Sequence, residues 1–65
     1  MFGKKIYELR TENKLTQLQL AKELGVSKQN ISDWENEKSE TSFLILIKLA
    51  KFFKVSTDYI LGLED

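Results

Sequence analysis

The sequence contains no cysteine, no histidine and no proline, and only three of its 65 residues are glycine. Without cysteine no disulfide can form, and without both cysteine and histidine the common soft metal sites are excluded. No apolar run approaches the roughly 18 residues that span a bilayer, and the initial stretch MFGKKIYELR lacks the apolar segment of a signal peptide. We therefore expect a cytoplasmic protein that needs no cofactor or metal, is not bound to a membrane, and is held together by its core alone.

A net charge is also missing, because ten basic residues balance ten acidic ones. The strong positive charge that usually accompanies nucleic-acid binding is therefore absent. Catalysis is disfavoured as well, since the chain has no His, no Cys and no Gly-rich phosphate loop, and its carboxylates lie on helix faces. These absences predict a protein that is not an enzyme and that acts by binding, with no small-molecule site in evidence.

Short helices are expected from the spacing of apolar residues and from the residues that begin and end helices. Side chains on one face predict a first helix over about 3–13, and these are Ile6, Leu9, Arg10 and Asn13. Thr16 and Gln19 form a Thr-x-x-Gln capping box that begins a second helix. Gly25 ends this second helix, because glycine readily adopts the left-handed conformation.

The remaining helices begin after serine residues. Ser27 caps a third helix over about 28–36. Ser42 caps a fourth helix, FLILIKLAKFF, and Ser56 caps a short fifth helix, TDYILG, which Gly62 stops. The expected fold class is therefore all-α, with one domain that forms a compact bundle of five short helices over the whole chain.

Apolar residues predict which face of each helix is buried. The inward residues of the second and third helices are Leu20, Ala21, Leu24, Ile31 and Trp34. Trp34 could alternatively offer a stacking surface to a base, but its spacing from Ile31 favours the core. The predicted inward stripe of the fourth helix is Phe43, Leu46, Ile47, Ala50 and Phe53, with Leu49 beside it. The residues that project elsewhere are Leu44, Ile45 and Phe52.

The stretch KELGVSKQNISDW joins the second and third helices through a short turn that contains glycine, which is typical of a helix-turn-helix. The outward face of the third helix is made of Lys28, Gln29, Asn30, Ser32, Asp33 and Asn36. A merely solvated helix more often carries Glu and Lys four residues apart. Amide and hydroxyl side chains at the start of a helix are instead suited to reading base edges in a major groove.

Several segments occur in a recognisable order: ELR, LTQ, LAKELGVS, IS, WEN, LIKLAKFFKVS and DYIL. In this order and spacing the chain resembles, over residues 6–61, the Cro-like and Xre-like phage-repressor family of helix-turn-helix domains. Single segments are common in proteins, but the whole ordered set is specific. The resemblance implies a lambda-repressor-like bundle, a helix-turn-helix over about 17–36, and a third helix that enters the major groove of double-stranded DNA.

The resemblance also implies roles for individual residues. Base-reading positions of the family are matched by Ser27, Lys28, Gln29 and Asp33. Gln17 matches a residue that touches the DNA backbone and braces a base-reading side chain. Positions that approach phosphates are matched by Asn30, Asn36 and Lys38. Arg10 and Glu35 match a pair that joins the first helix to the third beneath the DNA-facing surface.

The loop after the third helix departs from the family pattern. Asn36-Glu37 stands where the family often has Asn-Gly, so one of these two residues must accept a positive φ. Glu35, Glu37 and Glu40 lie near the expected path of the phosphates, and Lys38 is the one basic residue left there. These residues predict a weak phosphate contribution and a shallow dependence of DNA affinity on salt.

Asp33 is a second departure, because phosphate repels a carboxylate and guanine O6 and N7 cannot pair with it. A carboxylate can accept from the amino group of cytosine, so we expect a cytosine at the base pair that Asp33 faces. The N-termini of the second and third helices would supply part of the missing positive field through their backbone N–H groups.

Two functions remain open. The first is a sequence-specific transcriptional regulator, most simply a repressor. One recognition helix reads only a few base pairs, so this function implies a homodimer on a palindromic operator. Leu44, Thr57 and Tyr59 are expected to belong to its self-association surface. The alternative is a repressor-like protein-interaction module, such as an antitoxin or anti-repressor partner, which the zero net charge and the additional apolar residues favour.

Overall fold

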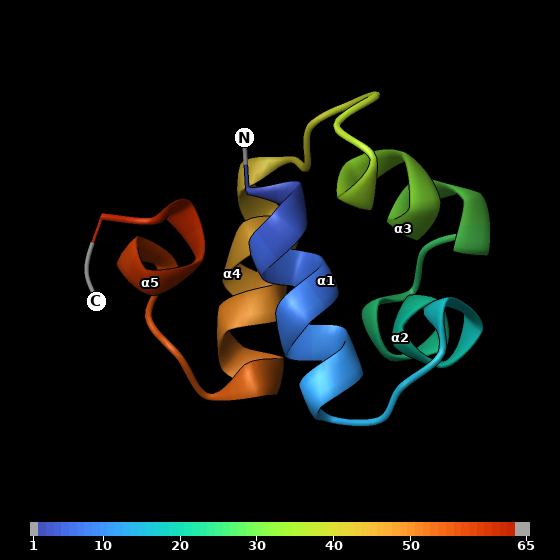
Figure 1. Cartoon of the computed structure of the whole chain (residues 1–65), viewed down its shortest axis with the longest axis horizontal. Helices are drawn as coiled ribbons and strands as arrows, with labels where there is room; N and C mark the ends of the chain where they lie inside the picture. Colours follow the sequence, from blue (N-terminus) through green and yellow to red (C-terminus); the bar gives the residue numbers. More distant parts are fainter. Residues whose placement is uncertain (1, 64–65) are drawn as a thin grey trace.

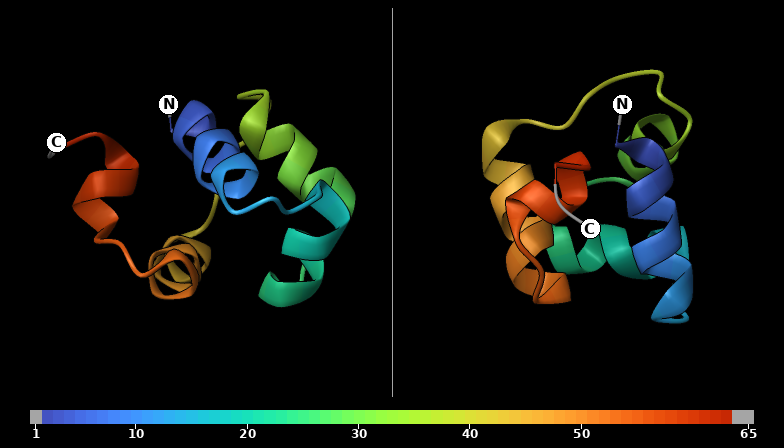
Figure 2. Two further views of the ribbon diagram at one scale, coloured as in Figure 1. Left: turned by 60° about the horizontal axis from the view of Figure 1, so that its bottom comes forward. Right: turned by 60° about the vertical axis from the view of Figure 1, so that its left-hand side comes forward.

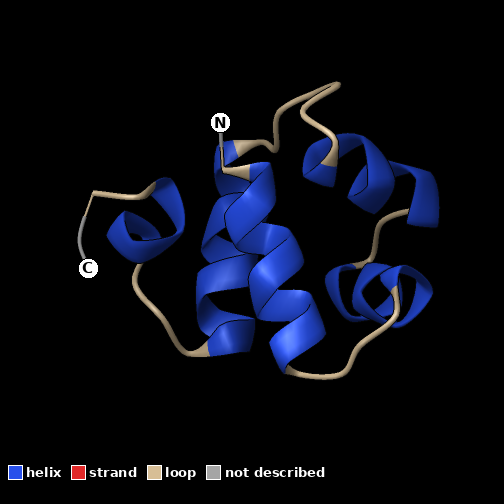
Figure 3. Ribbon diagram, in the orientation of Figure 1, coloured by secondary structure: helices blue, strands red, loops and turns tan. Residues whose placement is uncertain are grey.

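The computed structural model describes residues 2–63, and this part of the chain consists of five α-helices joined by short loops (Figure 1). The helices are α1 (Gly3–Glu12), α2 (Gln17–Leu24), α3 (Lys28–Glu35), α4 (Phe43–Phe53) and α5 (Thr57–Leu61). Figure 3 shows helix and loop and no strand within the described residues. The predicted all-α fold class is confirmed, and α1 and α3 each end one residue earlier than expected.

The first helix separates two groups of helices. α2 and α3 lie together on one side of α1 and α5 lies on its other side, both in Figure 1 and in the left view of Figure 2. α3 packs on α1 and α2, while α4 packs on α2 and α5. The helix-turn-helix is therefore supported from behind by α1 and α4, and the outer side of α3 faces away from the bundle.

Hydroxyl side chains begin four of these helices, as predicted. The side-chain oxygens of Thr16, Ser27, Ser42 and Ser56 each accept from the backbone N–H three residues later, at 3.1, 3.1, 3.2 and 2.9 Å. The Gln19 side chain in turn accepts from the Thr16 backbone N–H at 2.8 Å, which completes the capping box. Each such cap stabilises a helix by about 1 kcal/mol relative to alanine.

All five helices in the described range end in the same way. A residue with positive φ follows each helix, and the next backbone N–H donates to a carbonyl oxygen five residues earlier. These residues are Lys14, Gly25, Glu37, Lys54 and Gly62, with φ of 58°, 72°, 61°, 59° and 78°. The sequence predicted the two glycine positions. After α3, where the family often has glycine, the sequence predicted a positive φ at Asn36 or Glu37. Glu37 is the residue that adopts it.

The core draws side chains from every helix. Its buried members are Ile6, Leu9, Leu20, Ala21, Leu24, Ile31, Trp34, Leu46, Leu49, Ala50 and Ile60. The inward faces expected for α2 and α3 are confirmed, and Trp34 is part of the core rather than a surface for base stacking. Asn13, which was expected on the inward face of the first helix, is exposed and follows the end of α1.

The predicted orientation of α4 was partly wrong. Phe43 was expected to point inward, but 73% of it is exposed. Ile45, which was expected to project elsewhere, packs against the core. The buried face is centred on Leu49, and Ile45 lies one turn before that residue on the same face. Apolar residues occupy nearly every side of this helix, so the sequence pattern does not specify which face is buried. Packing against α2 and α5 determines the buried face.

Candidate nucleic-acid interface

The turn between α2 and α3 holds the two helices at a set angle. Gly25 is left-handed, and the N–H of Val26 donates to the carbonyl of Ala21 at 3.0 Å. Val26 packs against the core, and Ser27 then begins α3 by accepting from the N–H of Asn30. These contacts restrict the backbone rotations of the turn residues. The turn thereby directs the start of α3 outward from the bundle.

Arg10, Glu35 and Gln17 form a hydrogen-bonded network that joins three helices. Nε of Arg10 donates to Oε2 of Glu35 at 2.6 Å, and Nη2 donates to Oε1 at 3.1 Å. Gln17 Nε2 donates to the same Oε1 at 3.1 Å. Only 11% of the Arg10 side chain and 5% of the Glu35 side chain are exposed. The two-pronged pair fixes the end of α3 to α1 and holds the side chain of the first residue of α2.

The surroundings of Arg10 keep its guanidinium charged. Nη1 donates to the carbonyl of Leu15 at 2.8 Å, and the group lies 5.3 Å from the centre of the Tyr7 ring. The hydrogen bond with Glu35 raises the pKa of Arg10, while burial lowers it by a smaller amount. Arg10 therefore remains protonated at any pH at which DNA binding is measured.

The outward face of α3 presents a short row of polar side chains. Lys28 and Gln29 are exposed in its first turn, and Asp33 is half-buried one turn later. Nε2 of Gln29 donates to Oδ1 of Asp33 at 2.8 Å. The amide nitrogen of Asn36 donates back to the carbonyl of Ser32 at 2.8 Å, so this side chain closes the helix end. Ser27, Asn30 and Lys38 are exposed at the two ends of the same helix.

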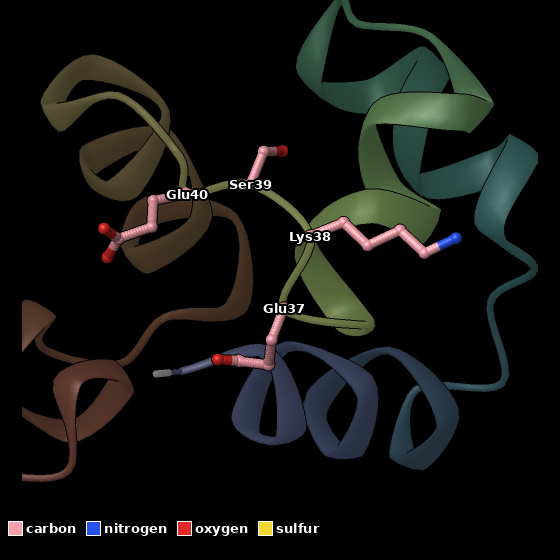
Figure 4. A pocket seen from close by; sticks show the side chains of 4 residues that line it. All are labelled: Glu37, Lys38, Ser39 and Glu40. Carbon is pink, nitrogen blue, oxygen red and sulfur yellow. The ribbon is translucent and has the colours of Figure 1, made fainter.

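The loop after α3 is less acidic on its outer side than its sequence indicates. Oε1 of Glu37 accepts from the backbone N–H of Gly3 at 2.6 Å, so this carboxylate caps α1. Figure 4 shows Glu37 directed toward α1, Glu40 directed away from α3, and Lys38 extending on another side of the loop. Glu35 is buried in its pair with Arg10. Of the three carboxylates expected near the phosphates, Glu35 binds Arg10 as the sequence predicted, and Glu37 binds the Gly3 N–H, which the sequence did not predict.

Sequence reasoning missed the close packing at Gly3. A Cβ atom on this residue would collide with the carbonyl oxygen of Trp34 and with the side chain of Glu37. Glycine therefore allows the start of α1 to meet the end of α3. No local pattern signals this contact, since Gly3 and Glu37 are 34 residues apart in the sequence.

The residues expected at a dimer surface lie on α4 and α5, which pack on each other, whereas α3 packs on α1 and α2. Leu44 of α4 is 71% exposed. Thr57 and Tyr59 of α5 are half-buried, and the ammonium group of Lys5 lies 4.5 Å from the centre of the Tyr59 ring. Because Leu44 is so exposed, the described residues, including those after α5, leave it largely uncovered. The polar face of α3 and the exposed Leu44 therefore belong to different helices.

Residues 2–63 contain no group of three or more acidic residues placed to hold a metal ion. No helix in the same range has both the length and the apolar character to cross a membrane.

Comparison with known proteins places the chain in a family. Residues 6–60 match the model of the Helix-turn-helix family, and the chain belongs to that family. It is 38% identical over its full length to the HTH-type transcriptional regulator YobD of Bacillus subtilis (strain 168), of which it spans 58%. It is 42% identical over 98% of its length to the HTH-type transcriptional activator BcrR of Enterococcus faecalis, of which it spans 31%. The chain thus covers about half or less of each of these relatives.

The fold is also that of a solved repressor. The crystal structure of the c2 repressor of Salmonella phage P22 in complex with a synthetic operator superposes with a TM-score of 0.90 and 34% sequence identity. The superposition covers 98% of this chain and 97% of that one. The resemblance to phage repressors that the sequence predicted is therefore confirmed.

Proposed function

We propose that the chain is the sequence-specific DNA-binding domain of a transcriptional regulator, most simply a cytoplasmic repressor, without catalytic activity of its own. One observation carries this proposal: α3 buries Ile31 and Trp34 and turns Lys28 and Gln29 outward on a helix-turn-helix. The near-identity in fold to a repressor that was solved on operator DNA supports it. In this proposal α3 lies in the major groove and its first turn meets the base edges.

The contacts divide into base reading and backbone positioning. We assign base reading to the first turn of α3 and the residue one turn later, which are Ser27, Lys28, Gln29 and Asp33. We assign backbone contacts to the residues around it, which are Gln17, Asn30, Asn36 and Lys38. Gln17 is held by Glu35, and Asn36 by Ser32, so both side chains are ordered before DNA arrives. Ordered contact groups lose less conformational freedom on binding.

The charge balance of this face is consistent with DNA binding despite the zero net charge of the chain. Glu35 pairs with Arg10, and Glu37 accepts from the Gly3 N–H. Lys28 and Lys38 remain exposed. The N-termini of α2 and α3 add partial positive charge. We therefore expect a modest phosphate contribution, with a salt slope of about 0.9 per neutralised phosphate.

We further propose that the domain binds DNA as a homodimer. One recognition helix discriminates by about 1–3 kcal/mol per base pair over a few base pairs, which is too little to select one genomic site. Two copies on a palindrome, with half-sites about 10 base pairs apart, would double the number of base pairs read. The exposed Leu44 on α4, with Thr57 and Tyr59 of α5, supports a self-association surface made by these two helices.

In vitro selection from random duplexes tests this function directly. The expected result is a palindromic site with two identical half-sites, and Gln29→Ala should relax the preference at one base pair of each half-site. Lys28→Ala should weaken binding either at one base pair or equally on all duplexes. In the second case the salt slope should fall by about one. Failure of the parent to enrich any sequence would overturn the proposal and favour the protein-interaction module.

A further inference from the structure

The hydrogen bond between Gln29 and Asp33 differs from the other polar side-chain contacts of α3. Nε2 of Gln29 donates to Oδ1 of Asp33 at 2.8 Å, between side chains one turn apart on the outward face. The contact of Asn36 with Ser32 satisfies a backbone carbonyl at the helix end and so has a structural purpose. The bond from Gln29 to Asp33 satisfies no backbone group. Its effect is to hold the Gln29 amide in one orientation.

A carboxylate determines that orientation because it can only accept hydrogen bonds. The nitrogen of the Gln29 amide must face Asp33, since a flipped amide would set its carbonyl oxygen against a negative charge. One N–H is used by Asp33, which leaves one N–H and the carbonyl oxygen of the amide for a ligand. A glutamine held in this way therefore presents one donor beside one acceptor.

One donor beside one acceptor matches the major-groove edge of adenine. Adenine offers N7 as an acceptor and its N6 amino group as a donor, whereas guanine offers two acceptors, N7 and O6. A free glutamine could turn its NH₂ group toward guanine, but this turn would bring its carbonyl oxygen onto Asp33. The pair therefore favours adenine and disfavours guanine at the same base pair.

We propose that Asp33 is a positioning residue for Gln29, and that the two side chains read one adenine as a unit. This inference rests on the proposed DNA binding and deepens it by naming the base. The bond occupies Oδ1 of Asp33 and leaves Oδ2 able to accept from a cytosine at the adjacent step, as the sequence predicted. Asp33 thereby influences two base pairs, its own and the one that Gln29 faces.

The experiment compares base preferences of four variants with the parent, by selection from random duplexes and then by titration of the selected site and its single-base changes. Gln29→Ala identifies the base pair that Gln29 reads, where the parent should prefer adenine to guanine by roughly 5- to 100-fold. Asp33→Ala should reduce that preference by about fivefold or more at the same base pair. Asp33→Glu keeps a carboxylate, which can only accept from the Gln29 amide, and should retain most of the preference. Glu8→Ala removes a carboxylate from α1, outside the residues assigned to DNA contact, and is the control that should leave the preference unchanged.

Ratios of affinities separate this role from general charge effects. Removal of the Asp33 charge lowers phosphate repulsion equally on all duplexes, and this uniform change cancels in the ratio between duplexes that differ only at the base pair that Gln29 reads. Thermal unfolding of each variant checks that the helix is intact. A parent that selects no sequence would overturn the proposed function itself. A selective parent whose adenine preference survives Asp33→Ala, or is lost equally in Asp33→Glu, would overturn the positioning role alone.

Discussion

The helices α1–α3 and the helices α4–α5 are held in place by different interactions. In the first group, directed hydrogen bonds join the elements: Arg10 to Glu35, Gln17 to Glu35, and Gly3 to Glu37. In the second group the contacts are mainly apolar, and Phe43 and Leu44 remain largely exposed. Hydrogen bonds specify angles and distances, whereas apolar burial specifies only that surface is covered.

This difference matches the two tasks proposed for the molecule. Base reading needs side chains held within fractions of an ångström, and the network behind α3 supplies that precision. Self-association needs an apolar surface that a second copy can cover, which α4 offers. If the difference is real, substitutions in the two groups should fail in different ways.

The largest effect is expected from breaking the pair of Arg10 and Glu35. Either Arg10→Ala or Glu35→Ala should lower the free energy of unfolding by at least about 2 kcal/mol, because the remaining charge is left nearly buried without its partner. The double variant Arg10→Met with Glu35→Leu should recover much of this loss, since apolar residues of similar size need no partner. Denaturant unfolding of the parent and the three variants measures these values.

The pair of Lys5 and Glu8 provides a matched control for that experiment. Its side chains are 29% and 40% exposed, and the charged atoms are 3.6 Å apart. Glu8→Ala should lower the free energy of unfolding by no more than about 0.5 kcal/mol, as for other exposed pairs. If Arg10→Ala proved as harmless as Glu8→Ala, the network would not support α3.

A smaller effect is expected at Leu44, and it should appear in association rather than in stability. Leu44→Glu places a charge on the surface that a second copy is proposed to cover, and should weaken self-association at least about tenfold. Because Leu44 is exposed, the stability of the monomer should change by less than about 0.5 kcal/mol. Sedimentation velocity of the parent and the variant, with and without operator DNA, measures the oligomeric state.

Leu18→Glu is the matched control for Leu44, because Leu18 is also an exposed leucine but lies on α2. It should leave association in the absence of DNA unchanged. A parent that stays monomeric even on its operator, or a Leu44→Glu variant that associates as well as the parent, would contradict the proposed surface.

The smallest effects are expected at two residues that have nearly the same backbone φ. Lys54 follows α4 with φ of 59° and Glu37 follows α3 with φ of 61°. Lys54→Gly should raise the free energy of unfolding by about 0.5–1 kcal/mol, because glycine relieves the left-handed conformation. Glu37→Gly gains the same relief but loses the bond to the Gly3 N–H, so it should lower the free energy of unfolding by about 1 kcal/mol. Chemical denaturation decides, and equal changes in the two variants would show that the cap on α1 contributes nothing.

Much of the fold could be predicted because the physics that forms these helices is local. A hydroxyl cap acts on the N–H three residues later, so Thr16, Ser27 and Ser42 marked helix starts correctly. The outward row of α3 followed from the narrow apolar seam of Ile31 and Trp34, both of which are buried. The bond from Gln29 to Asp33 was within reach of the same reasoning, since it joins residues one turn apart.

The sequence by itself therefore determined the five helices, their starts, the glycine ends at Gly25 and Gly62, and the polar face of α3. Tertiary structure alone decided which side of α4 is buried, because that helix is apolar nearly all round and any face could have served. It also decided the left-handed φ of Glu37, which places the carboxylate on the N–H of Gly3. These outcomes depend on groups far apart in the chain, whose energies no local pattern of residues contains.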